Sequence, residues 1–196
     1  MLEVAVIEKP SVAAATLEPV RARLLHELVE PASASVLASK LGLSRQKVNY
    51  YLRGLEKHGL IELVEERRKG NMTERVMRAT ASAYVISPSA CGPVAPDPSR
   101  SPDRLSTRWL LAVASRLVQD VGALIEAGAT SGKRVATFAI DGEVRFASAA
   151  QRAAFAQELS EAVADLVAKY HDEGAAKGRS HRLVVALHPS MNQDKE

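Results

Sequence analysis

The stretch from Ser44 to His58, with the sequence SRQKVNYYLRGLEKH, constrains the fold of this chain more than any other. Val48, Leu52 and Leu55 recur at i, i+4 and i+7, so a helix over this stretch carries one apolar face that needs a core to cover it. Ser44 directly precedes the helix and is a favoured N-cap residue. The sequence therefore predicts a capped helix that is held to a core by one side and exposed on the other.

The opposite face of this helix is polar and cationic. Its side chains can hydrogen-bond base edges or phosphates, and no acidic residue lies among them. They are Gln46, Asn49, Tyr50, Arg53 and Lys57, with Arg45 on the flank, and Ser44 at the start of the helix is a further candidate DNA contact. This composition favours contact with nucleic acid, and the alternative is a solvated polar face, since such faces are common on helices.

The flanking segments extend the pattern. Upstream, a single helix is predicted after Thr16, with Pro19 tolerated in its first turn and an apolar stripe of Leu17, Val20, Leu24 and Leu28. Residues 33–41 predict a compact helix capped by Ser33, and Gly42 stands where a left-handed turn residue is needed before the next helix. Two helices joined by a tight glycine turn form a helix-turn-helix. Downstream, residues 59–66 and 74–79 predict two strands of a β-hairpin wing with a basic tip. The candidate DNA contacts of this wing, residues 67–75, are Arg67, Arg68, Lys69, Asn71 and Arg75.

The run VLASKLGLSRQKVNYYLRGLEKHGLIELVEERRKG resembles the winged-helix domain of the ArsR-type bacterial repressors. Ten residues fall on the family's pattern: Leu37, Ala38, Leu41, Gly42, Ser44, Val48, Leu52, Leu55, Gly59 and Leu60. The resemblance spans residues 17–79 and implies a winged-helix fold that binds DNA. The chain has Tyr50 and Tyr51 where many members carry His. It also lacks the cysteine-rich motif of metal-sensing members, so no metal sensing is expected.

Charge is concentrated where this resemblance lies. Residues 40–78 hold ten Lys and Arg and five Glu, a net charge of +5, whereas residues 104–196 carry a net charge of +1. The excess falls on the recognition helix and the wing, where phosphate contacts would be made. Cys91 is the only cysteine and cannot form an intrachain disulfide, which fits a reducing cytoplasm. Residues 1–7 have the features of neither a signal peptide nor a membrane span.

The second half of the chain predicts a further module. Residues 87–103 contain five prolines and predict a linker after a winged-helix domain at 1–86. Residues 104–196 then predict, in order, a long amphipathic helix, strands at 135–140 and 143–146 around Asp141-Gly142, a helix capped by Ser148, and a strand at 183–187. The expected fold class is α+β, with an N-terminal winged helix-turn-helix domain and a small α-β-β-α-β module. We expect this module to dimerise and to hold an effector pocket between the long helix and the sheet, at Trp109, Phe138 and Phe146.

The expected function is a cytoplasmic, homodimeric, sequence-specific transcriptional regulator that acts as a repressor. Its partners would be double-stranded DNA, a second copy of the chain and an unidentified small-molecule effector, and no cofactor is expected. It would read a palindromic site with helix 44–58 and wing 67–75. The alternative is a protein-interaction or effector-sensing module whose winged helix contacts protein. No phosphate loop or nucleophile motif indicates an enzyme, and the spacing of the histidines indicates no metal site.

Overall fold

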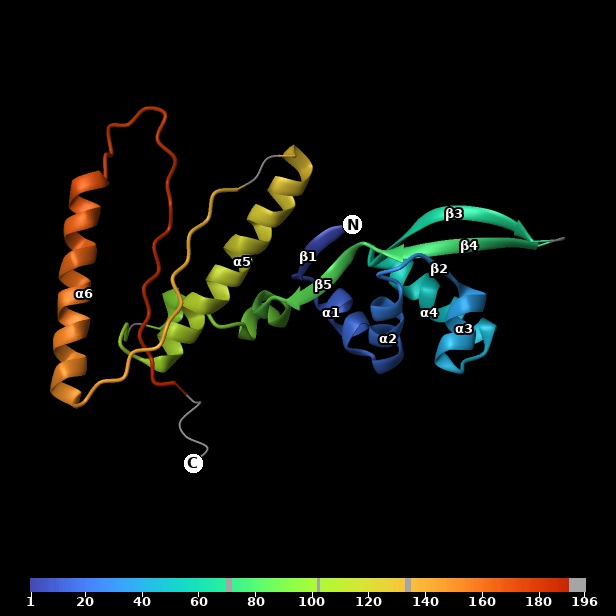
Figure 1. Ribbon diagram of the computed structural model, residues 1–196, viewed down its shortest axis with the longest axis horizontal. Helices are drawn as coiled ribbons and strands as arrows, with labels where there is room; N and C mark the ends of the chain where they lie inside the picture. The colour runs from blue at the N-terminus through green and yellow to red at the C-terminus, as the bar shows by residue number, and fades with distance from the viewer. Residues whose placement is uncertain (70–71, 102, 133–134, 191–196) are drawn as a thin grey trace. The chain divides into compact units, whose positions relative to one another are not determined.

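The computed structural model describes residues 1–196 except 70–71, 102, 133–134 and 191–196, and it leaves the side chains of Lys69 and Met72 undescribed. The chain divides into two compact units, Met1–Ala136 and Thr137–Glu196. The N-terminal part of the first unit, from blue to green in Figure 1, holds the helix-turn-helix. Its first elements are β1 (Leu2–Ile7), α1 (Pro10–Leu17), α2 (Pro19–Glu27), α3 (Ala34–Leu41) and α4 (Arg45–Lys57).

Local capping sets the ends of α3 and α4 as the sequence predicts. Ser33 Oγ accepts a hydrogen bond from the Val36 N–H at 3.4 Å, and Ser44 Oγ accepts one from the Lys47 N–H at 3.2 Å. Gly42 ends α3 with φ = 65°, a left-handed conformation that costs glycine little. The two predicted helices and the tight turn between them are therefore confirmed.

The first helix differs from the expected one. The sequence predicts a single helix after Thr16 with Pro19 in its first turn, but the structure breaks the chain at Glu18. Glu18 has an extended backbone, and its carboxylate accepts a hydrogen bond from the Arg21 N–H at 2.9 Å. Proline lacks an N–H and is therefore favoured at the first position of a helix, so α2 begins at Pro19. Leu17, expected to start the apolar stripe, is exposed.

The apolar face of α4 lies in the core of the winged helix. Val48, Leu52 and Leu55 are all buried, as the spacing predicts. They belong to a cluster whose largest fully buried members include Leu24, Leu28, Leu37 and Met77. Burial of each such side chain contributes about 1.5–3 kcal/mol relative to exposure. This core fixes which face of α4 points outwards.

The predicted wing is formed by an antiparallel sheet. It consists of β2 (Ala32–Ser33), β3 (Ile61–Lys69) and β4 (Met72–Ala79) in the order β2-β4-β3. A register shift between Leu63 and Glu65 marks a bulge in β3, and bulges bend the strand that carries them. Asn71, expected to contact DNA from the wing tip, lies outside the described residues.

A parallel pair of strands joins the N-terminus to the winged helix. β1 pairs with β5 (Ala81–Ile86), which directly follows the wing strand β4. The Leu2 N–H donates to the Thr80 carbonyl at 2.8 Å, and the Tyr84 hydroxyl donates to the Leu60 carbonyl at 2.9 Å. The N-terminal residues thus form an edge strand, and β5 is attached to the segment that follows the recognition helix.

The structure differs from the expected linker and domain boundary. Within residues 87–103 the chain forms two 3-10 helices, η1 (Pro88–Val94) and η2 (Pro98–Arg100), and then enters α5 (Thr107–Ser131). Small residues let α5 approach β1, because a Cβ on Gly122 would lie only 2.8 Å from the Cβ of Val6. The contacts between α5 and β1 carry the first compact unit on to Ala136. Proline content predicted an extended linker, but proline is also favoured at the first position of these short helices.

The second unit contains helix α6 (Ala149–Tyr170). Its predicted cap is confirmed, since the Gln151 N–H donates to Ser148 Oγ at 3.1 Å and Gln151 Oε1 accepts from the Ala147 N–H at 3.0 Å. The strands predicted at 135–140, 143–146 and 183–187 are wrong, because these described segments have no strand pairing. An apolar run makes a strand locally favourable, but its ladder of hydrogen bonds needs a neighbouring strand. Of the expected α-β-β-α-β module, the structure has the helices α5 and α6, and the α+β class is confirmed by the chain as a whole.

Candidate nucleic-acid interface

The polar face of α4 is exposed along its length. Residues on this face line a shallow hollow, and all of them were expected from the sequence to contact DNA: Arg45, Gln46, Asn49, Tyr50 and Arg53. Ser44, another candidate on this segment, uses its hydroxyl to cap the helix, and Lys57 is exposed at the C-terminal end of α4. The core and the cap together hold this face outwards, so its side chains can reach a partner without any change in the backbone.

Tyr50 is exposed on this face, with 68% of its surface accessible to solvent. Its ring packs edge-on against Tyr51, with centroids 5.5 Å apart, and the guanidinium of Arg21 lies 5.8 Å from the centre of the Tyr51 ring. Arg21 passes close to Gly54, where a Cβ would come within 3.4 Å of its guanidinium. Contacts from α2 therefore support the orientation of an exposed tyrosine on the recognition helix.

A second hollow lies between α4 and β4. Its lining combines recognition-helix residues, including Asn49, Arg53 and Glu56, with wing residues, including Glu74 and Arg75. Glu56 and Glu74 were not among the residues that the sequence predicts for this surface. Glu56 could have been found, because Asn49, Arg53 and Glu56 follow one another at i, i+4 and i+7 and so share a face. Glu74 could not, since its place beside α4 depends on how the wing folds back.

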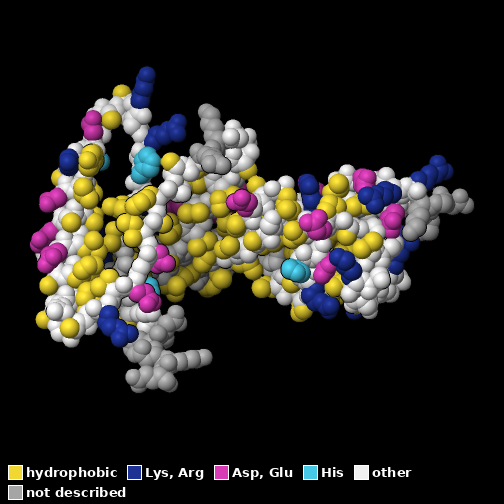
Figure 2. Space-filling model, in the orientation of Figure 1, with side chains coloured by type: hydrophobic (Ala, Val, Ile, Leu, Met, Phe, Trp, Pro, Cys, Tyr) yellow, Lys and Arg dark blue, Asp and Glu magenta, His cyan; other side chains and the backbone are white. Residues whose placement is uncertain are grey.

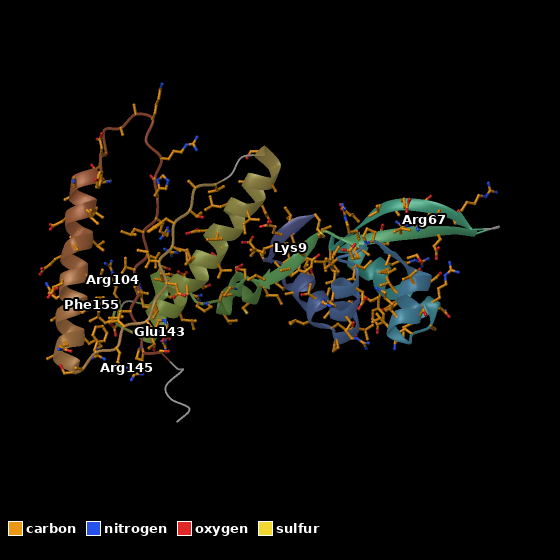
Figure 3. The ribbon with its side chains drawn as sticks, viewed as in Figure 1. Lys9, Arg67, Arg104, Glu143, Arg145 and Phe155 are labelled. Atoms are coloured by element: carbon orange, nitrogen blue, oxygen red, sulfur yellow. The ribbon has the colours of Figure 1, made fainter. Side chains whose placement is uncertain are left out.

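The charged candidates fall into two groups. Within the described part of the chain, Arg45, Arg53 and Arg68 take part in no ion pair. Arg67, labelled in Figure 3, forms an ion pair with Glu65 on the same strand. Figure 2 shows the result on one face, where Lys and Arg side chains over the wing are interspersed with Asp and Glu. The cations that remain available for phosphates are therefore fewer than the sequence suggests.

Arg75 belongs to the paired group. Its Nη2 donates to Glu56 Oε1 at 2.6 Å and its Nη1 donates to Glu56 Oε2 at 3.1 Å, while Nε lies 4.0 Å from Glu66 Oε1. The hydrogen bonds from Arg75 hold the pKa of the Glu56 carboxyl below its ordinary value. Further along the β3–β4 pair, Arg78 hydrogen-bonds Glu62 on the opposite strand and lowers its pKa in the same way. Both carboxylates thus stay ionised and bound to arginine at neutral pH.

The candidate effector residues lie in different parts of the structure. Trp109 is half-buried on α5 of the first unit, whereas Phe138 and Phe146 belong to the second unit. Phe138 is 88% exposed, and Phe146 packs on Phe155 of α6 with ring centroids 5.3 Å apart. The expected pocket depended on a sheet over residues 135–146, and these residues form no strands. The structure therefore gives the effector site no support.

Nor do the described residues hold a group of three or more His, Cys, Asp and Glu side chains that could bind a metal ion. His171 Nε2 lies 3.5 Å from Glu173 Oε1 in an exposed pair, and Cys91 is exposed on η1. In the part of the chain that the structure describes, no helix is long and apolar enough to cross a membrane.

Comparison with known proteins bears on the segment that carries this interface. No curated protein matches the chain. Among solved structures, the chain is similar to a "possible transcriptional regulatory protein (fragment 1-100)" from Mycobacterium bovis, with 18% identity, 58% of this chain and 88% of that chain covered, and a TM-score of 0.30. Residues 16–64 match a family model described as a helix-turn-helix domain. These residues contain α2, α3 and α4 with their caps and glycine turn, and they form a helix-turn-helix domain.

Proposed function

We propose that this protein is a sequence-specific DNA-binding transcriptional regulator that works in the cytoplasm as a homodimeric repressor. The recognition helix α4 would enter the major groove, and the wing would lie along the adjacent backbone. Repression is inferred from the resemblance of residues 17–79 to ArsR-type repressors.

The observation that carries this proposal is the two-sided character of α4. Its apolar face is buried, its N-terminus is capped, and its outer face offers side chains that can read bases. Asn49 can pair with adenine and Arg53 with guanine through two hydrogen bonds each. Arg45 and Arg68 have no ion-pair partner among the described residues and could neutralise phosphates. A merely solvated helix would need none of this.

The dimer is supported by the two faces of α5. This helix turns small buried residues, Ala112 and Gly122 among them, towards the rest of the unit. The opposite side carries Leu117, Val121 and Leu124, whose surfaces are 43%, 38% and 41% exposed. Their spacing of four and three residues is the heptad spacing of a helix that packs on another helix. A second copy of α5 about a two-fold axis would cover this stripe and supply two recognition helices for a palindromic site.

DNA binding is tested by mixing the purified protein with fragments of the genome that encodes it and recovering the fragments that it binds. On a recovered fragment, Asn49→Ala or Arg53→Ala should cost about 1–3 kcal/mol of specific binding and relax the preference at one position of each half-site. Arg152→Ala, an exposed charge on α6, is the control with the same change in net charge as Arg53→Ala. If the α4 variants bind like this control, α4 is not the reader.

The dimer is tested by analytical ultracentrifugation. Leu117→Glu places a charge in the exposed stripe and should give a monomer that no longer binds the two half-sites cooperatively. Leu111→Glu is the matched control, because Leu111 is 62% exposed but lies outside the stripe. A wild-type protein that is monomeric at micromolar concentration and still binds its site tightly would contradict the dimer.

The alternative is that the winged helix contacts another protein. Salt separates the two functions, because DNA binding that releases several counterions weakens steeply as the salt concentration rises. A protein interface dominated by apolar contacts has no such slope. If the selection recovers no fragment whose binding weakens steeply with salt, the alternative is favoured.

A further inference from the structure

Arg75 has the residue type and the position of a phosphate ligand, but its side chain is already engaged. The guanidinium makes two hydrogen bonds to the two carboxylate oxygens of Glu56, at 2.6 and 3.1 Å. A second carboxylate, that of Glu66, has its Oε1 4.0 Å from Arg75 Nε. A phosphate approaching this arginine would meet two negative charges and would have to displace a bidentate partner.

The two ends of this ion pair come from the two parts of the proposed reader. Glu56 lies near the C-terminal end of α4, and Arg75 lies on the wing strand β4. Glu66 stands opposite Arg75 in the β3–β4 register, so the same arginine also contacts the second wing strand. Glu56 and Arg75 both line the hollow between helix and wing. The pair therefore crosses the space that separates the base-reading face from the backbone-contacting wing.

We propose that Arg75 is a positioning residue, which sets the place of the wing relative to the recognition helix through Glu56 and binds no phosphate itself. This inference rests on the proposed DNA-binding function. Bidentate pairing restricts both side chains to one geometry, which a single ammonium group could not do. The wing then contacts phosphates through other residues such as Arg68, which has no ion-pair partner within the described residues.

The salt dependence of DNA binding separates a phosphate ligand from a positioning residue. Each neutralised phosphate contributes about 0.9 to the slope of log K against log salt concentration. Arg68→Gln should therefore lower the slope by roughly that amount. Arg75→Gln and Glu56→Gln should each weaken specific binding roughly two- to fivefold, the loss expected of an exposed ion pair, with an unchanged slope. The double variant should be no weaker than either single variant, because both remove the same contact.

A charge exchange sharpens this test. In Glu56→Arg with Arg75→Glu the pair is rebuilt in the opposite sense, and binding should recover above that of Arg75→Glu alone. Arg75→Lys keeps the charge but cannot bind both oxygens, so its affinity should fall between those of wild type and Arg75→Gln. The proposal is overturned if Arg75→Gln lowers the salt slope as much as Arg68→Gln does. It is equally overturned if Glu56→Gln tightens binding, or if the exchanged pair is as weak as Arg75→Glu.

Amide hydrogen exchange tests the same contact without DNA. In the free protein, Glu56→Gln and Arg75→Gln should speed exchange in the outer wing, at residues 66–68 and 73–75, because the strands lose their tie to α4. Arg68→Gln should leave exchange there unchanged. If the protein proves not to bind DNA, faster exchange in the first two variants still supports the positioning role. Equal exchange in all variants would refute it whatever the DNA assay shows.

Discussion

The contact between α5 and β1 predicts that Gly122→Ala destabilises the protein, although alanine is the better helix former. Gly122 is buried inside α5, and a Cβ there would lie 2.8 Å from both the Cβ and one Cγ of Val6, and 3.0 Å from the other Cγ. Carbon atoms in favourable contact are about 3.5–4.0 Å apart. The 2.8 Å distance is shorter than a favourable contact by about 1 Å, so the helix and the strand would have to move apart by about that much.

Two opposing effects set the size of the change. Replacing a helix-interior glycine by alanine stabilises a helix by about 0.5–1 kcal/mol. Forcing an extra carbon into a packed contact costs about 1–3 kcal/mol. The clash is with a β-branched side chain on a paired strand, including the Cβ that is fixed to its backbone, so Val6 cannot avoid it by changing rotamer. We therefore expect a net loss of about 1–2 kcal/mol in the free energy of unfolding.

Urea denaturation followed by the fluorescence of Trp109 measures this loss, because Trp109 is the only tryptophan of the chain and lies on α5. Gly54→Ala is the matched control. A Cβ on Gly54 would meet only the end of the flexible Arg21 side chain, at 3.4 Å, so the helix gain should dominate there. Wild-type or higher stability in Gly122→Ala would refute the close packing of α5 on β1.

The core under the recognition helix, the Glu56 carboxyl and the response to metals give three further expectations. Leu55→Ala should cost about 2–5 kcal/mol in urea denaturation, since Leu55 is fully buried; a loss near zero would contradict the core. In an NMR titration the lowered Glu56 pKa should rise in Arg75→Met. In the unchanged protein, the contribution of the pair to the free energy of unfolding is present above the unfolded-state pKa of about 4.3 and should disappear as the pH falls through the lower folded-state pKa. Zinc, nickel or arsenite should leave DNA affinity unchanged; a large loss at stoichiometric metal would show a site that the isolated Cys91 does not suggest.

Local sequence determined the helix-turn-helix. The caps Ser33 and Ser44 and the left-handed Gly42 act within one turn of chain, and the spacing of Val48, Leu52 and Leu55 follows from helix geometry alone. Each of these features depends on residues close together in the sequence, so the helices, the turn and the exposed face of α4 could be predicted. The break at Glu18 was the exception, because Pro19 fits both the middle of a first turn and its first position.

Tertiary structure decided which charged side chains of the interface are paired and which are available to a partner. Arg75 and Glu56 are nineteen residues apart, and their pairing depends on the wing folding back beside α4. The sequence shows an arginine in a basic wing and predicts a phosphate ligand. The opposed positions in the β3–β4 ladder, which bring Glu66 to the same arginine, are set by the strand register. Composition could therefore predict a cationic surface, while the availability of each cation was fixed by its neighbours in space.

The same distinction explains the second half of the chain. The alternation around Asp141-Gly142 and the apolar run at 183–187 made strands favourable, but a strand exists only where another strand satisfies its N–H and C=O groups. In the interiors of α5 and α6 the backbone hydrogen bonds lie within the helix, and Ser106 and Ser148 next to them cap their first turns, which is why caps and apolar spacing were enough to predict these helices. The sequence by itself determined the elements whose hydrogen bonds are local. The pairing of β1 with β5, the packing of Gly122 on Val6 and the absence of a sheet at 135–146 were decided by contacts between distant residues.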